Sequence, residues 1–240
     1  MQRIFAALLA SLFMSPAFAQ EVGAPAVKPQ DSWIYGHTVE DRTGWHHTRV
    51  EHTVVRVGSS DILLAIKEAG STAPPREQLV GADWSRFRNV NGKEVVVNRP
   101  FAFPLVPGKT WEVEYTEEHP NAEHSKEHVQ LRFTVVGWED VTVPAGTLRA
   151  MKVEAEGHWT ADLAPAASAA TASRVDAQGA TVVMRTNKVI PQTATGRLYK
   201  AFWYSPDAKR SAKALEEYYG SNGVRTERLT DELESFKPAK

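Results

Sequence analysis

The chain has 240 residues, 42% of them hydrophobic, which is enough to bury one sizeable core or two small ones. Its 28 lysines and arginines almost balance 29 aspartates and glutamates, and this near-neutral charge argues against a protein that binds nucleic acid through phosphate contacts. The absence of cysteine excludes thiol catalysis, iron–sulfur clusters, disulfides and the lipid-modified cysteine of a bacterial lipoprotein.

The first residues have the pattern of a secretory signal peptide. Arg3 supplies a positive charge, residues 4–14 form a mostly apolar run, and Ala17 and Ala19 are the small residues of a cleavage site. The apolar run is too short to cross the hydrocarbon core of a membrane, which is about 30 Å thick. We therefore expect cleavage between Ala19 and Gln20 and delivery of the mature chain to the periplasm, with no later transmembrane segment.

The mature chain is expected to form one β-rich domain. Residues 20–30 are rich in small and polar residues and predict a flexible lead-in. Over residues 31–236, apolar and polar residues alternate with the period of two that is typical of antiparallel strands with one buried and one wet face. The clearest examples are residues 111–116, 129–135 and 151–156.

Turn signals separate these strands. Asn91-Gly92 predicts a hairpin, because both residue types tolerate positive φ angles. The pattern favours a mostly β fold, either a curved antiparallel sheet or an open half-barrel. Further turns are expected at Gly58–Asp61, Pro107-Gly108, Pro144–Gly146 and Asn222-Gly223.

Two segments depart from the alternation. Residues 162–180 are rich in alanine, serine and threonine, and predict a long, exposed and disordered Ala-rich loop. Ser205-Pro206-Asp207 has the residue preferences of a helix start, and small or apolar residues follow it at helical spacing. We therefore expect one short helix over residues 206–217.

Four motifs together resemble a known family. In chain order they are Asp83–Phe87, Phe103–Trp111, Gly137–Val153 and Phe202–Arg210. This ordered set resembles the DUF3108-like group, exported bacterial proteins of unknown function, over most of the mature chain. The resemblance implies a curved, largely antiparallel sheet protein of the cell envelope. It implies no reaction, because the group offers no catalytic residues to carry over.

Histidines are the candidate metal ligands. Among the eight in the chain, His119, His124 and His128 lie close together in a stretch rich in glutamate. On a helix, His124 and His128 would share one face, but on a strand they would lie about 13 Å apart, too far to share one ion. Solvated histidines are the favoured interpretation, and a metal-dependent hydrolase that uses these three is the alternative.

Aromatic residues are the candidate ligand-binding residues. The chain has seven tryptophans, and the favoured interpretation is that such rings fill the space under a curved sheet. A concave face left partly open would take a lipid or another apolar molecule. Surface tryptophans that stack on sugar rings would instead indicate a carbohydrate or peptidoglycan binder. The residues expected to form the apolar face are Trp111, Tyr115, Phe133, Trp138, Trp203 and Tyr204.

Motifs of common enzymes are absent from the sequence. There is no nucleophile elbow and no glycine-rich phosphate loop. The carboxylate pairs Glu117-Glu118 and Glu216-Glu217 lie in charged stretches, where we expect them to be solvated. We therefore predict a non-catalytic periplasmic protein, without a cofactor, that binds an apolar ligand or an envelope protein. The edges of an open sheet would offer such a protein a place to pair.

Overall fold

The computed structural model describes five stretches of the chain. These are residues 21–121, 124–163, 169–175, 181–187 and 192–240. The signal peptide expected at residues 1–19 and its cleavage site lie outside the described residues. Within the described part no helix is long and apolar enough to cross a membrane.

The described residues form an all-β fold. Twelve strands make one antiparallel sheet, and two further strands, β10 and β11, make a separate hairpin. The sequence therefore predicted the fold class correctly. The strands are β1 (Ser32–Asp41), β2 (Gly44–Val57), β3 (Asp61–Glu68), β4 (Arg76–Gly81), β5 (Arg86–Val90), β6 (Lys93–Asn98), β7 (Thr110–Glu118), β8 (His124–Val143), β9 (Gly146–Leu163), β10 (Ala169–Val175), β11 (Thr181–Asn187), β12 (Thr193–Ser205), β13 (Arg210–Tyr219) and β14 (Arg225–Lys237).

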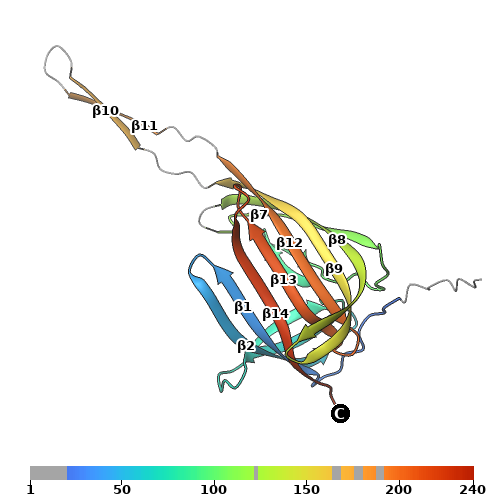
Figure 1. Ribbon diagram of the computed structural model, residues 1–240. Coiled ribbons are helices and arrows are strands. Elements are labelled where there is room, and N and C mark those ends of the chain that lie inside the picture. Colours follow the sequence, from blue (N-terminus) through green and yellow to red (C-terminus); the bar gives the residue numbers. More distant parts are fainter. Residues whose placement is uncertain (1–20, 122–123, 164–168, 176–180, 188–191) are drawn as a thin grey trace, which may run out of the picture.

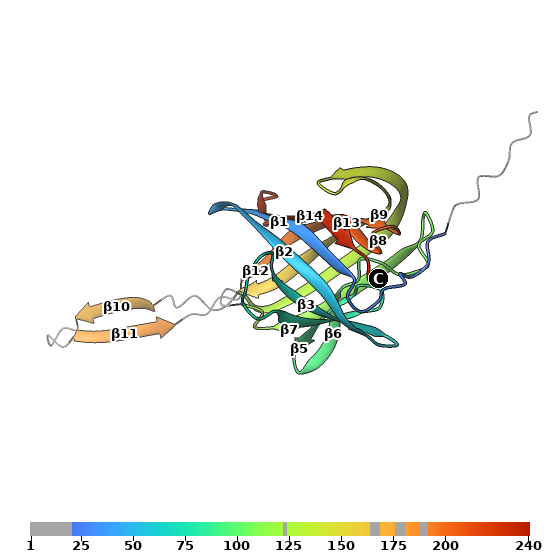
Figure 2. The ribbon, with the colours of Figure 1, turned by 90° about the horizontal axis from the view of Figure 1, so that it is seen from below.

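The large sheet curls into a nearly closed barrel, while the β10–β11 hairpin stands away from it (Figures 1 and 2). The strand order is β6-β5-β4-β3-β2-β1-β14-β13-β12-β9-β8-β7, so β6 and β7 are the two edges. Most neighbours follow each other in the chain, and the pairing of β1 with β14 joins the two halves. Strand β10 occupies part of the segment for which an Ala-rich loop was expected, and residues 164–168 and 176–180 lie outside the described part.

Side chains, rather than a backbone ladder, hold the two edges of the sheet together. In the turn between β5 and β6, the Asn91 side chain donates to the Thr116 carbonyl at 3.1 Å and accepts from the Glu118 amide at 2.9 Å. Arg88 also forms an ion pair with Glu117. The half-barrel suggested by the sequence is therefore too open, because contacts between edges this far apart in the chain have no local sequence signal.

The expected turns are present, but the expected helix is wrong. Asn91 and Gly92 have φ angles of 53° and 81° and join β5 to β6, as predicted. In place of a helix over residues 206–217, the Lys209 amide donates to the Pro206 carbonyl at 3.1 Å, which closes a tight turn into β13. The residues that follow alternate between the two faces of β13, so a strand that pairs on both sides replaces the helix.

Aromatic and aliphatic side chains make up the core of the barrel. Trp33 stacks on Phe236 at 5.4 Å, and its ring meets Trp84 edge-on at 5.6 Å. Phe101 packs against Tyr204 at 5.1 Å. The largest fully buried side chains are Trp33, Tyr204, Phe101, Phe133, Ile62, Leu64, Leu105, Leu131, Met151, Leu233, Val54 and Val135.

Both ends of the described chain are tied to this core. In the lead-in, Val22 is buried and pairs with Leu105 through two backbone hydrogen bonds of 3.0 and 2.8 Å. The carboxylate of Asp31 is buried, accepts from the Ala239 amide at 2.7 Å and pairs with Lys209 at 2.9 Å.

Candidate functional site

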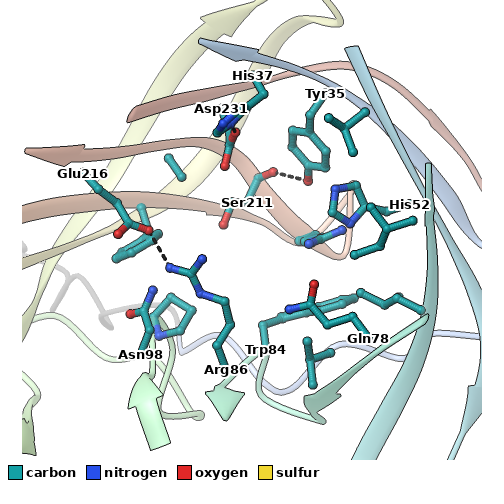
Figure 3. A pocket seen from close by; sticks show the side chains of 18 of the residues that line it. Tyr35, His37, His52, Gln78, Trp84, Arg86, Asn98, Ser211, Glu216 and Asp231 are labelled. Carbon is teal, nitrogen blue, oxygen red and sulfur yellow. Dashed lines mark hydrogen bonds and ion pairs between the residues drawn. The ribbon is translucent and has the colours of Figure 1, made fainter. Parts of the chain in front are cut away.

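The barrel interior contains a cavity of about 310 Å³ beside the packed core (Figure 3). Its wall combines aliphatic, aromatic and charged side chains from β1–β6 and β12–β14. The lining residues are Tyr35, His37, Val50, His52, Leu64, Ile66, Arg76, Gln78, Val80, Trp84, Arg86, Asn98, Pro100, Phe202, Arg210, Ser211, Ala214, Glu216 and Asp231.

Strand β13 brings charge into the barrel interior. Ala214 and Glu216 are two residues apart on the strand, so they share one face, and both line the cavity, which identifies this face as the inner one. The register with β12 shifts between Ser211 and Lys213, and beyond this irregularity Arg210 and Ser211 both line the cavity. A sheet that closes on itself therefore encloses a positive and a negative side chain from a single strand.

Glu216 forms the centre of a buried charge cluster. Its carboxylate lies 2.7 Å from Lys200 Nζ and 2.7 Å from Arg86 Nη2, which reaches it across the cavity in Figure 3, and it accepts a 3.1 Å hydrogen bond from the Tyr218 hydroxyl. Burial alone would raise the pKa of Glu216, but Lys200 and Arg86 outweigh burial and lower that pKa to about 2. The prediction that Glu216 is solvated is therefore wrong, because β13 is a strand whose inner face bears this residue.

Arg210 lies among aromatic rings and forms no ion pair with a carboxylate of the described residues. Its Cζ is 4.8 Å from the ring centre of Trp84, 5.3 Å from that of Tyr35 and 5.5 Å from that of Trp33. Within the part of the chain that the structure describes, its Nη1 atom is buried and has no hydrogen-bond partner. Burial lowers the pKa of this guanidinium, but arginine stays protonated in proteins.

Two histidines in the cavity wall have pKa values shifted in opposite directions. His37 Nδ1 lies 2.6 Å from Asp231 Oδ1, and this hydrogen bond raises the pKa of His37. Burial lowers the pKa of His52 well below its ordinary value, so this imidazole is neutral at pH 7. Its ring meets Tyr35 edge-on at 5.7 Å, and its buried Nδ1 has no hydrogen-bond partner among the described residues.

Three of the expected aromatic residues pack into or against the core. Phe133 and Tyr204 are almost completely buried. Trp111 stacks on Phe133 with ring centres 5.4 Å apart, and its indole N–H donates to the Arg99 carbonyl at 2.8 Å.

The other three expected aromatic residues are partly buried. Trp203 and Tyr204 are adjacent on β12 and point to opposite faces of the sheet. The indole N–H of Trp203 donates to Glu139 at 2.8 Å. Tyr115 and Trp138 each lie against an arginine, with Cζ-to-ring distances of 5.6 and 5.4 Å. The structure therefore distributes the six expected residues over several places, and none of them lines the cavity.

The three histidines considered as metal ligands are not brought together. His119 lies in the turn after β7, with a φ of 52°. His124 pairs with Glu127 at 2.8 Å, whereas His128 bonds to Thr116 Oγ1 at 2.9 Å. Among the described residues, no three histidine, aspartate or glutamate side chains are grouped so that they could hold a metal ion.

Sequence reasoning did not identify the residues that line the cavity. Arg210 and Glu216 were assigned to a helix, and His52 was one of eight histidines without a distinguishing neighbour. A usable signal exists in β13, where charged residues occupy the same alternate positions as Ala212 and Ala214. Charges at inward positions of a strand indicate a polar interior rather than an edge.

Comparisons with known proteins give similarity of fold alone. No family model matches the chain, and no curated protein sequence matches it significantly. A candidate exported protein with a YmcC-like fold from Bacteroides fragilis is 13% identical, with a TM-score of 0.43, and the match covers 91% of this chain and 100% of that one. A candidate lipoprotein from Parabacteroides distasonis is 14% identical, with a TM-score of 0.43, and covers 90% of this chain and 99% of that one. The DUF3108-like resemblance rests on the four sequence motifs alone.

Proposed function

We propose that the protein is a non-catalytic binding protein of the bacterial envelope that holds a small molecule inside its barrel. The observation that carries this proposal is the cavity beside the core. Its volume of about 310 Å³ lies at the lower end of the range of ligand pockets, roughly 300–1,000 Å³. A mixture of aromatic, aliphatic and a few converging polar groups is the usual wall of such a pocket.

The position of the cavity changes where the ligand is expected. The sequence favoured an apolar molecule on a concave aromatic face, but the expected aromatic residues lie elsewhere. A ligand inside the barrel would be surrounded by β1–β6 and β12–β14. The envelope location rests on the signal peptide pattern of residues 1–19 and on the DUF3108-like motifs.

Native mass spectrometry of the protein released gently from the periplasm tests this function. We expect a native mass larger than the denatured mass by one small organic molecule. The variant Ala214→Phe fills the cavity from β13 and should lose this extra mass. The control Leu215→Phe changes the neighbouring residue, on the other face of the same strand, and should keep it.

The two variants separate binding in the cavity from binding elsewhere. Extra mass that survives in Ala214→Phe would place the ligand outside the barrel and contradict the proposal. The proposal would also be contradicted if the wild-type protein, released gently and not dialysed, had no extra native mass.

A further inference from the structure

The charges in the cavity indicate which class of ligand it takes. We propose that the cavity is an anion site, in which the Arg210 guanidinium binds the carboxylate of a small amphipathic acid. This inference rests on the proposed function, since it names the ligand class of the same cavity. It goes further because it names Arg210 as the residue that binds the charged group of the ligand, and because it predicts that anions bind more tightly than neutral or cationic analogues.

Arg210 is the cation that the protein leaves for a ligand. Another arginine of the wall, Arg86, has the Glu216 carboxylate at 2.7 Å. Among the described residues, Arg210 lies on three rings, forms no ion pair with a carboxylate and is attracted by Asp231 only at longer range, and its Nη1 has no hydrogen-bond partner. A buried charge without a counter-charge is costly, whereas a desolvated guanidinium binds an incoming anion strongly. The arrangement therefore favours an anionic ligand.

The balance of charge along the wall agrees with this assignment. Three arginines, at positions 76, 86 and 210, face two carboxylates, Glu216 and Asp231. Both carboxylates are occupied, Glu216 by Lys200 and Arg86 and Asp231 by His37. The net positive charge of the wall therefore lies on the arginines. The two carboxylates repel an anion little, because the cations paired with them offset their negative charge.

The surroundings of Arg210 suit a planar carboxylate. Aromatic rings stack readily on the flat faces of a guanidinium, which leaves its N–H edge for a ligand, and this edge matches the two oxygens of a carboxylate. One further buried polar atom of the wall, His52 Nδ1, has no partner among the described residues. A neutral imidazole can donate one hydrogen bond to the same anion.

The rest of the wall suits a short apolar chain. Val50, Leu64, Ile66 and Val80 project into the cavity from β2, β3 and β4. At about 30 Å³ for each water-sized group, a volume of about 310 Å³ holds roughly ten non-hydrogen atoms. Octanoate has a carboxylate and an apolar chain within that size, so it is a suitable probe.

Isothermal titration calorimetry with three matched probes tests the charge preference. The wild-type mature protein is titrated with octanoate, 1-octanol and octylammonium, which have the same number of carbon atoms and differ in the charge of the head group. We expect octanoate to bind at least about tenfold more tightly than either of the others, since a hydrogen bond to a charged group is worth that much. Octanol or octylammonium binding as tightly as octanoate would overturn the anion site but leave the cavity as a binding site.

Variants of Arg210 test the assignment of the residue. Arg210→Gln should weaken octanoate binding at least about tenfold and leave octanol binding within about twofold. The control Arg197→Gln removes an arginine that also lies on an aromatic ring, Tyr219, at 4.2 Å but outside the cavity, and should change neither. Unchanged octanoate affinity in folded Arg210→Gln would overturn the proposal.

The design distinguishes this inference from the function on which it rests. If Arg210→Gln does not fold, the three-probe comparison on the wild-type protein decides the question alone. If no probe binds to the wild-type protein and its native mass is bare, both the anion site and the binding function are wrong. If an uncharged molecule co-purifies in the cavity, the binding function stands and the anion site is wrong.

Discussion

Glu216 organises the charged residues of the barrel interior. The substitution Glu216→Gln keeps the shape of the side chain but leaves Lys200 and Arg86 without a counter-charge. Removing one partner of a buried ion pair is expected to lower the free energy of unfolding by about 3–5 kcal/mol. Urea denaturation at pH 7 measures this loss.

An exposed glutamate provides the matched control. Glu118 pairs with Lys126 at 3.2 Å, and both side chains are about half exposed, so solvent screens their charges. Glu118→Gln is expected to cost about 1 kcal/mol or less. An equal loss of free energy of unfolding in the two variants would show that burial does not strengthen the ion pairs of Glu216.

The same carboxylate makes stability depend on acid. The pKa of Glu216 is about 2 in the folded protein, compared with 4.5 for an ordinary glutamate. A lowered pKa stabilises the fold above pH 4.5, and this contribution is lost as the pH falls towards 2. The full difference corresponds to roughly 3 kcal/mol. We expect the urea midpoint of the wild-type protein to fall more steeply between pH 5 and pH 3 than that of Glu216→Gln, and parallel curves would contradict this explanation.

At the scale of the elements, a close approach between β8 and β9 requires a glycine. A Cβ added at Gly157 would lie 1.9 Å from the Gln130 carbonyl oxygen, so an alanine would force two long paired strands apart. Gly157→Ala is expected to lower the free energy of unfolding by about 3 kcal/mol or more. Gly23→Ala, where a Cβ meets no atom within 4 Å, should change it by about 0.5 kcal/mol at most. Chemical denaturation of both variants is the measurement, and equal stabilities would refute the close approach.

The β5–β6 hairpin is the most weakly attached element of the barrel wall. A single residue pair, Val80 with Arg86, joins β5 to β4, and Asn91 makes two side-chain bonds to β7 beside the ion pair of Arg88. Asn91→Gly keeps a residue that accepts positive φ but removes those bonds. We expect hydrogen exchange of residues 86–98 to become roughly fivefold to thirtyfold faster, which corresponds to about 1–2 kcal/mol of local stability.

A second turn serves as the control for that hairpin. Asn222 bonds to the amide of Val224 within its own turn between β13 and β14. Asn222→Gly should therefore leave exchange of residues 86–98 unchanged. The same acceleration in both variants would mean that Asn91 does not attach the hairpin to β7.

The sequence predicted those elements whose structure is determined by residues close together in the chain. The turns at Asn91-Gly92 and Pro144–Gly146 follow from residues within the turn itself, and both were predicted. The helix expected over residues 206–217 was wrong, because Arg210 and Glu216 at inward positions hide the alternation of a strand. Closure of the barrel and the cavity could not be predicted, since they depend on pairs such as β1 with β14 at opposite ends of the chain.

At the scale of the whole molecule, the chain is expected to lose its first 19 residues. The apolar run and the Ala17–Ala19 site predict that the protein released by osmotic shock begins at Gln20. The intact mass of the denatured protein measures this directly. A mass that still includes residues 1–19 would instead indicate an anchored chain.

The pairing of the first strand with the last has a consequence for biogenesis. Ser32 of β1 lies opposite Lys237 of β14, so the barrel wall joins the beginning of the chain to its end. In a chain delivered with its N-terminus first, β1 has only β2 as a partner until residues 225–237 arrive. Closing a loop of roughly 200 residues must precede this pairing, which makes it a late step. A copy truncated before β14 is therefore expected to leave one side of β1 and one side of β13 unpaired, and such exposed edges invite pairing with other chains.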